Sequence, residues 1–552
     1  MIQPDALKTE SPWPWSPGRG VDVWALFVAC REGDLEAVKA LVARDPSLVR
    51  SHYEYRTPLS FAVRENRIDV AAYLLDLGAA RVGLGDPLEI ARDRGYAGMV
   101  ALLEDRLASL HNASARGEPV AAAIRARDLA RVRQLLDDTP ALLQAGDGRS
   151  GQPIHWAAMT RQIGLIDELL ARGADIDARR FDGARPIHLG NGDYFYRGWR
   201  DVPSEVSTTP REVYEHLVAK GAEVDAGMAA ATGNLARMRE LLDADPSLAW
   251  RASDYNSGYI GSGTPLQNAA GGGHADMVEL LLAHGADPNV PEEHIAPHGK
   301  ALYSAVYHRH YDIAKRLLER GAYPSQEVES SADTVWIAIR NRDRRMLELL
   351  VSHGAVWSVP IDLDASLTYR DLVALGLTRT LAVLAHYGDH EEAAVRLAAR
   401  PALADDPEAL QEAASQGHDA FVDLLLRIQP DLASRVIVSA PRHMAIALFE
   451  RGMNPDRPDW MGITPLHRFA ADGDVERAAL FLDHGADIEA RDDDSRSRPL
   501  AWAARRGREP MVEFLLRRGA QLRVSDDPEW ATPLAWATRR GHADVVRMLT
   551  RA

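Results

Sequence analysis

The sequence contains a single cysteine, Cys30, among 552 residues. One cysteine excludes an internal disulfide framework and any zinc site built on paired thiolates, so we expect a reducing, cytoplasmic compartment. Residues 1–20 contain no apolar core of the signal-peptide type, and no apolar run approaches the length that spans a bilayer. The sequence therefore predicts no association with a membrane.

Known catalytic signatures are also missing. There is no serine-nucleophile elbow, phosphate-binding P-loop, zinc-protease helix or dinucleotide-binding turn. The histidines at 294, 298, 308 and 310 have no cysteine or carboxylate at a recognisable ligand spacing. We therefore expect no metal and no cofactor, and an enzyme is the less favoured interpretation. A net charge of −16 argues against binding nucleic acid through the whole surface.

The chain does contain one pattern that recurs along most of its length. Residues 462–490 read GITPLHRFAADGDVERAALFLDHGADIEA, with a Thr-Pro start, two short apolar helical stretches joined by Gly-Asp, and a Gly-Ala-Asp exit. Pro465, Pro499 and Pro533 recur at intervals of 34 residues. A fixed period in this range indicates a stacked array of repeats.

The repeated unit has a physical rationale of its own. Thr464 can cap a helix, and Pro465 suits the first helical position because its missing N–H would have no partner there. Gly473 ends this helix in a left-handed conformation that glycine adopts at little cost. Neither helix is long enough to be stable alone, so each unit has to bury its apolar face against its neighbours.

The Thr-Pro-Leu-His start at a period near 33 residues resembles the ankyrin-repeat family over nearly the whole chain. The resemblance implies an all-α solenoid of about sixteen stacked helix-turn-helix repeats with short β-hairpin-like loops. It also implies recognition of a protein or peptide through the concave face of the array. A capped array with this net charge has no evident need to self-associate, so we expect a monomer.

The regularity of the repeat predicts the domain organisation. Breaks in the pattern divide the chain into an N-terminal Pro/Trp-rich arm (1–20), an N-terminal stack (21–358) with insertions at 189–212, 251–263 and 291–299, an irregular joint (359–377) and a C-terminal stack (378–552).

Ten histidines occupy repeated positions and are expected to be structural. They fall in the start motif (His155, His188, His467), at the Gly-His turn (His274, His310, His418, His542) or before the closing Gly-Ala (His284, His353, His484).

The three insertions fall in one region, close to Gly271 and Gly272, which leave the concave surface without side chains. We expect these loops to gather aromatic and polar groups into a binding site. The predicted binding residues are Asp193, Tyr194, Tyr196, Trp199, Asp254, Tyr255, Tyr259, His298, Tyr307 and His308. The alternative is that the long loops only pack on one another.

Two functions remain open from the sequence. The first is a scaffold that binds a protein or peptide through its concave face and central aromatic loops. The second is a closed pocket that binds or transforms a small molecule, with His308 or His298 as acid/base and Asp193 or Asp254 as its partner. An enclosed cavity over Gly271 and Gly272 would favour the second function, and an open surface the first.

Overall fold

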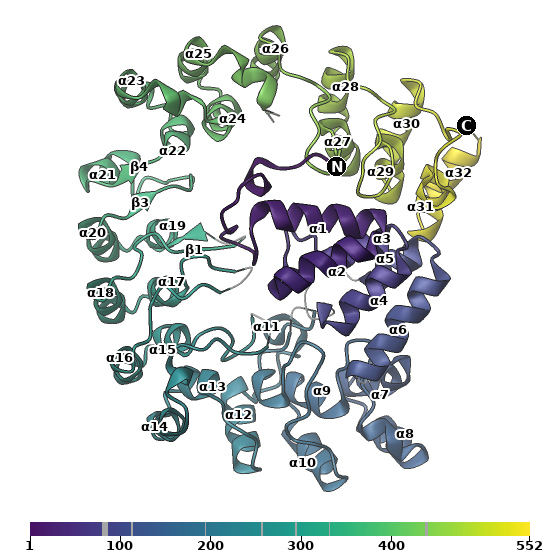
Figure 1. Ribbon diagram of the computed structural model, residues 1–552, viewed down its shortest axis with the longest axis vertical. Coiled ribbons are helices and arrows are strands. Elements are labelled where there is room, and N and C mark those ends of the chain that lie inside the picture. Colours follow the sequence, from purple (N-terminus) through teal and green to yellow (C-terminus); the bar gives the residue numbers. More distant parts are fainter. Residues whose placement is uncertain are drawn as a thin grey trace. The chain divides into compact units, whose positions relative to one another are not determined.

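The computed structural model describes residues 1–79, 87–111, 114–193, 195–255, 258–292, 295–329, 332–436 and 440–551. These residues form pairs of short helices stacked one after another (Figure 1), which confirms the expected helical repeat solenoid. The chain divides into an N-terminal unit, Glu10–Ala91 with Tyr96–Ala355, and a C-terminal unit, Val356–Ala552 with Met1–Thr9 and Arg92–Gly95.

Each repeat of the N-terminal stack contributes a first helix and then a second helix, except the repeat before α12 (Pro210–Ala219), which lacks a full first helix. The first helices are α1 (Gly20–Glu32), α3 (Pro58–Arg64), α5 (Pro87–Asp93), α7 (Glu118–Arg125), α9 (Pro153–Met159), α13 (Ala226–Ala231), α15 (Pro265–Gly272), α17 (Ala301–Tyr307) and α19 (Thr334–Arg340). The second helices are α2 (Leu35–Arg44), α4 (Ile68–Asp76), α6 (Ala97–His111), α8 (Leu129–Asp138), α10 (Ile163–Ala171), α12 (Pro210–Ala219), α14 (Leu235–Ala244), α16 (Ala275–Ala283), α18 (Tyr311–Glu319) and α20 (Arg344–Ser352).

The C-terminal unit continues the same alternation. Its helices are α21 (Tyr369–Ala374), α22 (Leu381–His386), α23 (His390–Ala399), α24 (Pro407–Gln416), α25 (Asp419–Ile428), α26 (Arg442–Glu450), α27 (Pro465–Asp472), α28 (Val475–Asp483), α29 (Pro499–Arg505), α30 (Glu509–Arg517), α31 (Pro533–Arg539) and α32 (Ala543–Arg551). Its apolar core runs between the helix pairs, where Leu384, Phe421, Phe481 and Leu515 are buried.

Short 3-10 helices replace the Gly-Ala-Asp exit in several repeats. In the exits at Asp45 and Asp245, the aspartate side chain accepts the N–H of the serine two residues later, and proline takes the first helical position. These turns are η2 (Pro46–Arg50), η5 (Pro140–Leu143), η7 (Pro246–Ala249), η8 (Pro401–Ala404) and η9 (Pro430–Arg435); η1 (Asp5–Leu7), η4 (Ala115–Gly117), η6 (Pro186–His188) and η10 (Glu529–Ala531) lie elsewhere.

The α15–α16 pair illustrates how the sequence builds a repeat. The Thr264 hydroxyl accepts the N–H of Gln267, Pro265 opens α15, and Gly273 ends it with a φ of +74°. Leu266, Ala269 and Ala270 of α15 are buried together with Met277, Val278, Leu281 and Leu282 of α16. Because each helix is short, this burial against the neighbouring repeats provides most of its stability.

Histidine rings connect successive repeats. The Nε2 atoms of four turn histidines lie within hydrogen-bond distance of a carbonyl oxygen in the preceding first helix: His274 with Ala231 (3.1 Å), His310 with Gly271 (3.2 Å), His418 with His386 (2.9 Å) and His542 with Arg505 (3.1 Å). In the start motif, Nδ1 of His155, His188 and His467 accepts a backbone N–H three residues earlier. These contacts confirm the structural role expected from the repeat positions.

The repeat that contains the first insertion has no full first helix. Its start forms only the 3-10 turn η6, after which Gly190, Asn191 and Gly192 follow in place of apolar helix formers. A bridge between Gly192 and Arg197 and the one-turn helix α11 (Gly198–Asp201) occupy the insertion before α12 begins.

The four short strands that the structure describes lie at two irregular places. In the N-terminal unit β1 (Glu327–Val328) pairs with β2 (Ala332–Asp333) in antiparallel fashion. In the C-terminal unit β3 (Val356–Trp357) pairs in parallel with β4 (Thr378–Arg379), and residues 359–377 connect these two strands through α21.

Candidate functional site

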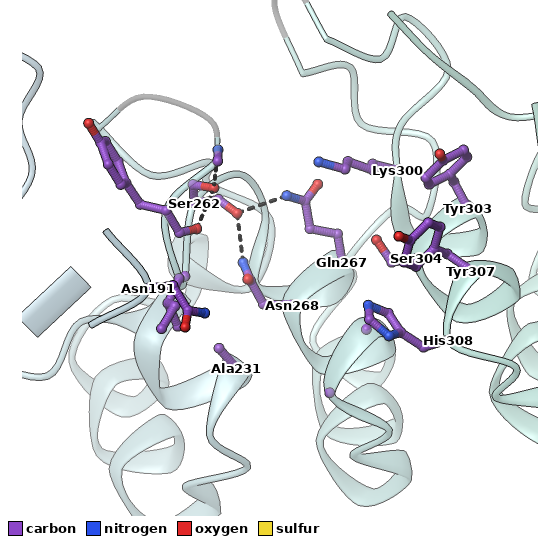
Figure 2. Close-up of a pocket in the computed structure, with 16 residues that line it drawn as sticks. Asn191, Ala231, Ser262, Gln267, Asn268, Lys300, Tyr303, Ser304, Tyr307 and His308 are labelled. Atoms are coloured by element: carbon purple, nitrogen blue, oxygen red, sulfur yellow. Dashed lines mark hydrogen bonds between the residues drawn. The ribbon is translucent and has the colours of Figure 1, made fainter. Parts of the chain in front are cut away.

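A pocket of about 570 Å³ opens on the first-helix side of the N-terminal unit. We call this pocket the central groove (Figure 2). It is lined by Asn191, Ala231, Gly258, Tyr259, Ile260, Gly261, Ser262, Gln267, Asn268, Gly271, Gly272, Lys300, Tyr303, Ser304, Tyr307 and His308. Its lining comes from three successive first helices, α13, α15 and α17, and from parts of two insertions. Its volume is that of pockets that hold small ligands or a few residues of a peptide.

One wall of the groove is aromatic and comes from α17. The rings of Tyr303 and Tyr307 stack with centroids 6.2 Å apart, because residues four apart share one face of a helix. The ring of His308 meets that of Tyr307 edge to face at 5.0 Å. Tyr307 is 51% exposed, so its ring is available to a ligand.

The neighbouring helix α15 carries two amide side chains whose orientation is fixed by hydrogen bonds. Gln267 Nε2 and Asn268 Nδ2 both donate to the carbonyl oxygen of Ser262 at 2.8 Å, and Asn268 Nδ2 also donates to the carbonyl oxygen of Thr264 at 2.9 Å (Figure 2). With both nitrogens engaged, each amide retains an oxygen that can accept a hydrogen bond.

Two adjacent glycines of α15 border the groove, and packing requires glycine at only one of the two positions. A Cβ atom added to Gly272 would lie 2.6 Å from the His274 ring, so packing requires this glycine. A Cβ atom added to Gly271 would lie 3.5 Å from Ser304 Cβ and 3.7 Å from the His308 ring, which are ordinary contacts. Packing therefore does not require glycine at position 271. Glycine is nevertheless present there, although it is less favourable within a helix than alanine.

The groove differs in charge from the chain as a whole. None of its lining residues is an aspartate or glutamate, and Lys300 is its one lysine. Burial, followed by the neighbouring His310, lowers the pKa of His308, so this imidazole is neutral at pH 7. The lining thus has a net positive charge in a protein with a net charge of −16.

A buried ion cluster holds the 251–263 insertion beside the groove. Arg180 Nη1 lies 2.9 Å from Asp193 Oδ2, and Arg180 Nη2 lies 3.4 Å from Asp182 Oδ2, with all three side chains buried. The Tyr259 hydroxyl donates to the same Asp182 oxygen, which fixes Tyr259 at the edge of the groove. Although burial opposes ionisation of Asp193, Arg180 and two backbone N–H groups outweigh it and lower its pKa.

A second ion cluster, centred on the buried side chains of Arg185 and His188, lies in the same region. Arg185 donates to Glu223 at 2.8 Å and to Asp225 at 2.7 Å, and His188 Nε2 lies 3.0 Å from Asp225. The ring of Tyr255 stacks on His188 with centroids 3.9 Å apart. These contacts assign Tyr255 to the support of the insertion and not to a ligand-facing surface.

Three of the predicted binding residues line the groove together, namely Tyr259, Tyr307 and His308. Asp193 and Tyr255 are buried in the clusters described above, and the ring of Tyr196 packs edge to face on Trp156 at 5.6 Å. The remaining predicted residues with described positions are Trp199, which is 80% exposed, Asp254, which pairs with Arg179 at 2.7 Å, and His298, which lies against Tyr323 at 4.7 Å. Tyr194 lies outside the described residues.

Several lining residues were not predicted from the sequence. From the α15 and α17 segments, only Gly271, Gly272, Tyr307 and His308 were named from the sequence. Gln267-Asn268 and Tyr303-Ser304 lie four residues earlier, one helical turn away on the same face. Extending the sequence pattern by one turn would have identified them.

The geometry gives no support to an acid/base pair in the groove. Asp193 is bound by Arg180 and Asp254 by Arg179. Among the described residues, neither carboxylate hydrogen-bonds to His308 or His298. Of the described carboxylates, Glu327 lies nearest to the His298 ring, at 3.9 Å. Across the described part of the chain, no three or more His, Cys, Asp or Glu side chains are placed to hold a metal ion.

Comparisons with known proteins identify the repeats. Family models of ankyrin repeats match residues 19–86, 226–328 and 438–526, and a single-repeat model matches residues 152–180. The ankyrin repeat and KH domain-containing protein mask-1 of Caenorhabditis elegans is 26% identical over 377 residues, which are 64% of this chain and 13% of the relative. The palmitoyltransferase Hip14 of Drosophila melanogaster is 33% identical over 93 residues, 16% of this chain and 15% of the relative.

The matched regions are thus a small part of the length of either relative. Of the helices that the structure describes, none combines the length and apolar character needed to cross a membrane.

Proposed function

The chain belongs to the ankyrin-repeat family, and on that premise we propose that it is a protein-interaction scaffold that binds an extended segment of a partner protein in the central groove. Ankyrin repeats indicate a scaffold for protein partners. The site and the form of the ligand are our inference. They rest on one observation: the groove is built from three successive first helices, so a ligand in it would contact three repeats at once.

The composition of the groove supports a peptide as the ligand. The exposed Tyr307 beside the buried ring of Tyr303 provides an apolar anchor, and the amide groups of Gln267 and Asn268 provide hydrogen-bonding partners for a peptide backbone. Gly271 supports the same proposal, because glycine at this position keeps the floor of the groove low without being required by packing. The open form of the groove favours a chain that runs along it over a small molecule that has to be enclosed.

The experiment is a selection of peptides against the full-length protein. A phage-displayed library of random dodecapeptides is screened on the immobilised chain, and enriched peptides are synthesised and measured by fluorescence anisotropy. Tyr307→Ala is expected to raise the Kd about 30-fold, the effect of removing an aromatic hot spot.

Tyr323→Ala is the matched control. Tyr323 is similarly exposed, at 43%, but does not line the groove. Its replacement should leave the Kd within about twofold. The proposal fails if the library yields no enriched peptide, or if Tyr307→Ala binds as tightly as the Tyr323→Ala control.

A further inference from the structure

The position that Lys300 occupies in the repeat points to a specific role. It stands at the residue preceding the first helix, where Thr57, Thr264 and Thr532 stand in other repeats. Each of those threonines accepts a backbone N–H with its hydroxyl and so caps its helix. A lysine side chain has no acceptor and makes no capping hydrogen bond at α17.

The capping role at α17 is filled by a different residue. Oε1 of the fully buried Gln326 accepts the N–H groups of Leu302 (2.9 Å) and Tyr303 (3.2 Å), and its Nε2 donates to the carbonyl oxygens of Pro288 and His298, both at 2.9 Å. The start of α17 is therefore satisfied without Lys300. The fold gives no reason for a lysine at this position.

Lys300 has no ionic partner among the residues that the structure describes. Within the described residues, no carboxylate lies within ion-pair distance of its ammonium group, and the lining of the groove contains no acidic residue. Figure 2 shows its side chain directed away from Tyr303 and into the groove. Lys300 is a partly buried residue, and an ammonium group without a described carboxylate partner beside a protein wall attracts a carboxylate, because the protein screens the attraction less than water does.

We propose that the partner segment carries an aspartate or glutamate whose carboxylate binds the Lys300 ammonium group. This inference rests on the proposed function, since it specifies the chemistry of the ligand in the same groove. Peptide residues on either side of the acidic residue would contact the ring of Tyr307 and the amide oxygens of Gln267 and Asn268. A basic segment would be excluded, because it would place a second cation beside Lys300.

The test compares peptide selections on the wild-type chain and on three Lys300 variants. Lys300→Met removes the charge at similar length, Lys300→Glu reverses it, and Lys300→Thr restores the residue found in other repeats. Because Lys300 does not cap α17, all three variants are expected to unfold at temperatures close to that of the wild type. Lys315→Met on α18, which removes an exposed lysine paired with Glu319, is the matched control.

The wild-type chain should enrich peptides with an acidic residue at one fixed position. Lys300→Met and Lys300→Thr should lose this preference and raise the Kd of the best wild-type peptide about tenfold, the typical effect of one charged hydrogen bond. Lys300→Glu should enrich lysine or arginine at that position. Replacing the acidic peptide residue by Gln or Asn should raise the Kd for the wild-type chain by the same factor as Lys300→Met. In the Lys300→Met chain, the same peptide change should have no further effect on the Kd.

The outcomes separate this inference from the proposed function. Enriched peptides that depend on Tyr307 but show no acidic preference, or that bind Lys300→Met as tightly as Lys315→Met, would overturn the carboxylate inference and leave the peptide groove intact. If no peptide depends on Tyr307, both proposals are overturned.

Discussion

The Nε2 atom of His310 lies 3.2 Å from the carbonyl oxygen of Gly271. A histidine at the turn of one repeat thereby holds the floor of the groove in the repeat before it. Gly271 therefore has two separate roles. The backbone of Gly271 serves the stacking of repeats, while its missing side chain leaves space in the groove.

The two glycines of α15 should respond in opposite ways to replacement by alanine. Gly271→Ala is expected to stabilise the protein by about 0.5–1 kcal/mol, because alanine favours a helix and the added methyl group meets no close contact. The same methyl group should weaken peptide binding, since it fills space beside Ser304 and His308. Gly272→Ala is expected to destabilise by about 1–3 kcal/mol through its clash with His274. Thermal unfolding and peptide titration of both variants check this prediction.

Arg180→Met should destabilise the N-terminal unit by about 3–5 kcal/mol, because it leaves the buried carboxylates of Asp182 and Asp193 without their cation. Arg179→Met is the matched control: its pair with Asp254 is exposed, and the expected change is below about 1 kcal/mol. Hydrogen exchange followed by mass spectrometry should locate the loss of protection in residues 152–219, since each repeat contacts only its neighbours. Equal effects of the two substitutions would contradict the buried-cluster assignment.

Acid should weaken the N-terminal unit through His155. Burial, followed by Arg180, lowers the pKa of this imidazole to about 3. Its Nδ1 accepts the N–H of Gln152. A proton bound to Nδ1 would remove this acceptor and bring two N–H donors face to face. The unfolded chain binds this proton near pH 6.5 and the folded chain does not. The contribution of the neutral ring is therefore complete above that pH and falls as the pH drops toward 3.

Lowering the pH from 7.5 to 5.5 is expected to reduce the stability of this unit by about 1.4 kcal/mol through His155 alone. Urea unfolding of the wild type and of His155→Gln, followed by tryptophan fluorescence, measures the effect. The variant should be less stable at both pH values but should lose less on acidification. An identical pH dependence in the variant would show that other groups cause the effect.

Two aromatic residues of the first insertion should differ sharply. Tyr196→Ala is expected to destabilise by about 3 kcal/mol, because its ring packs edge to face on Trp156 and its hydroxyl donates to the carbonyl oxygen of Asp201. Trp199→Ala should change stability by less than about 0.5 kcal/mol, because Trp199 is 80% exposed. Thermal unfolding distinguishes the two, and a large loss of stability in Trp199→Ala would contradict this placement.

The repeat itself could be predicted from the sequence because its determinants are local. The Thr264-Pro265 start, the left-handed Gly273 and the apolar faces of α15 and α16 lie within about twenty residues, and each acts on the backbone next to it. The turn histidines were equally predictable. A ring at a fixed position in the period meets a carbonyl oxygen at a fixed position in the preceding repeat.

The sequence predicts where the insertions lie in the chain, but it does not predict which contacts their side chains make. Aromatic and acidic residues there suggested a ligand surface, but Asp193 and Tyr255 instead hold the loops through partners such as Arg180 and His188. Sequence composition cannot distinguish a tyrosine that faces a ligand from one that supports a loop, since both roles use the same apolar ring and polar hydroxyl group.

The helical repeat, its period and the region of its interruption follow from local features of the sequence, because hydrophobic periodicity and turn residues act over short distances. Which side chains share the groove depends instead on contacts between repeats. Gln267, Lys300 and Tyr307 come from different repeats or opposite ends of a helix, and stacking brings them together. The first N–H groups of α17 are capped by Gln326, which lies 24 positions beyond Leu302 in the chain. Lys300 therefore does not cap the helix, and its side chain is directed into the groove (Figure 2).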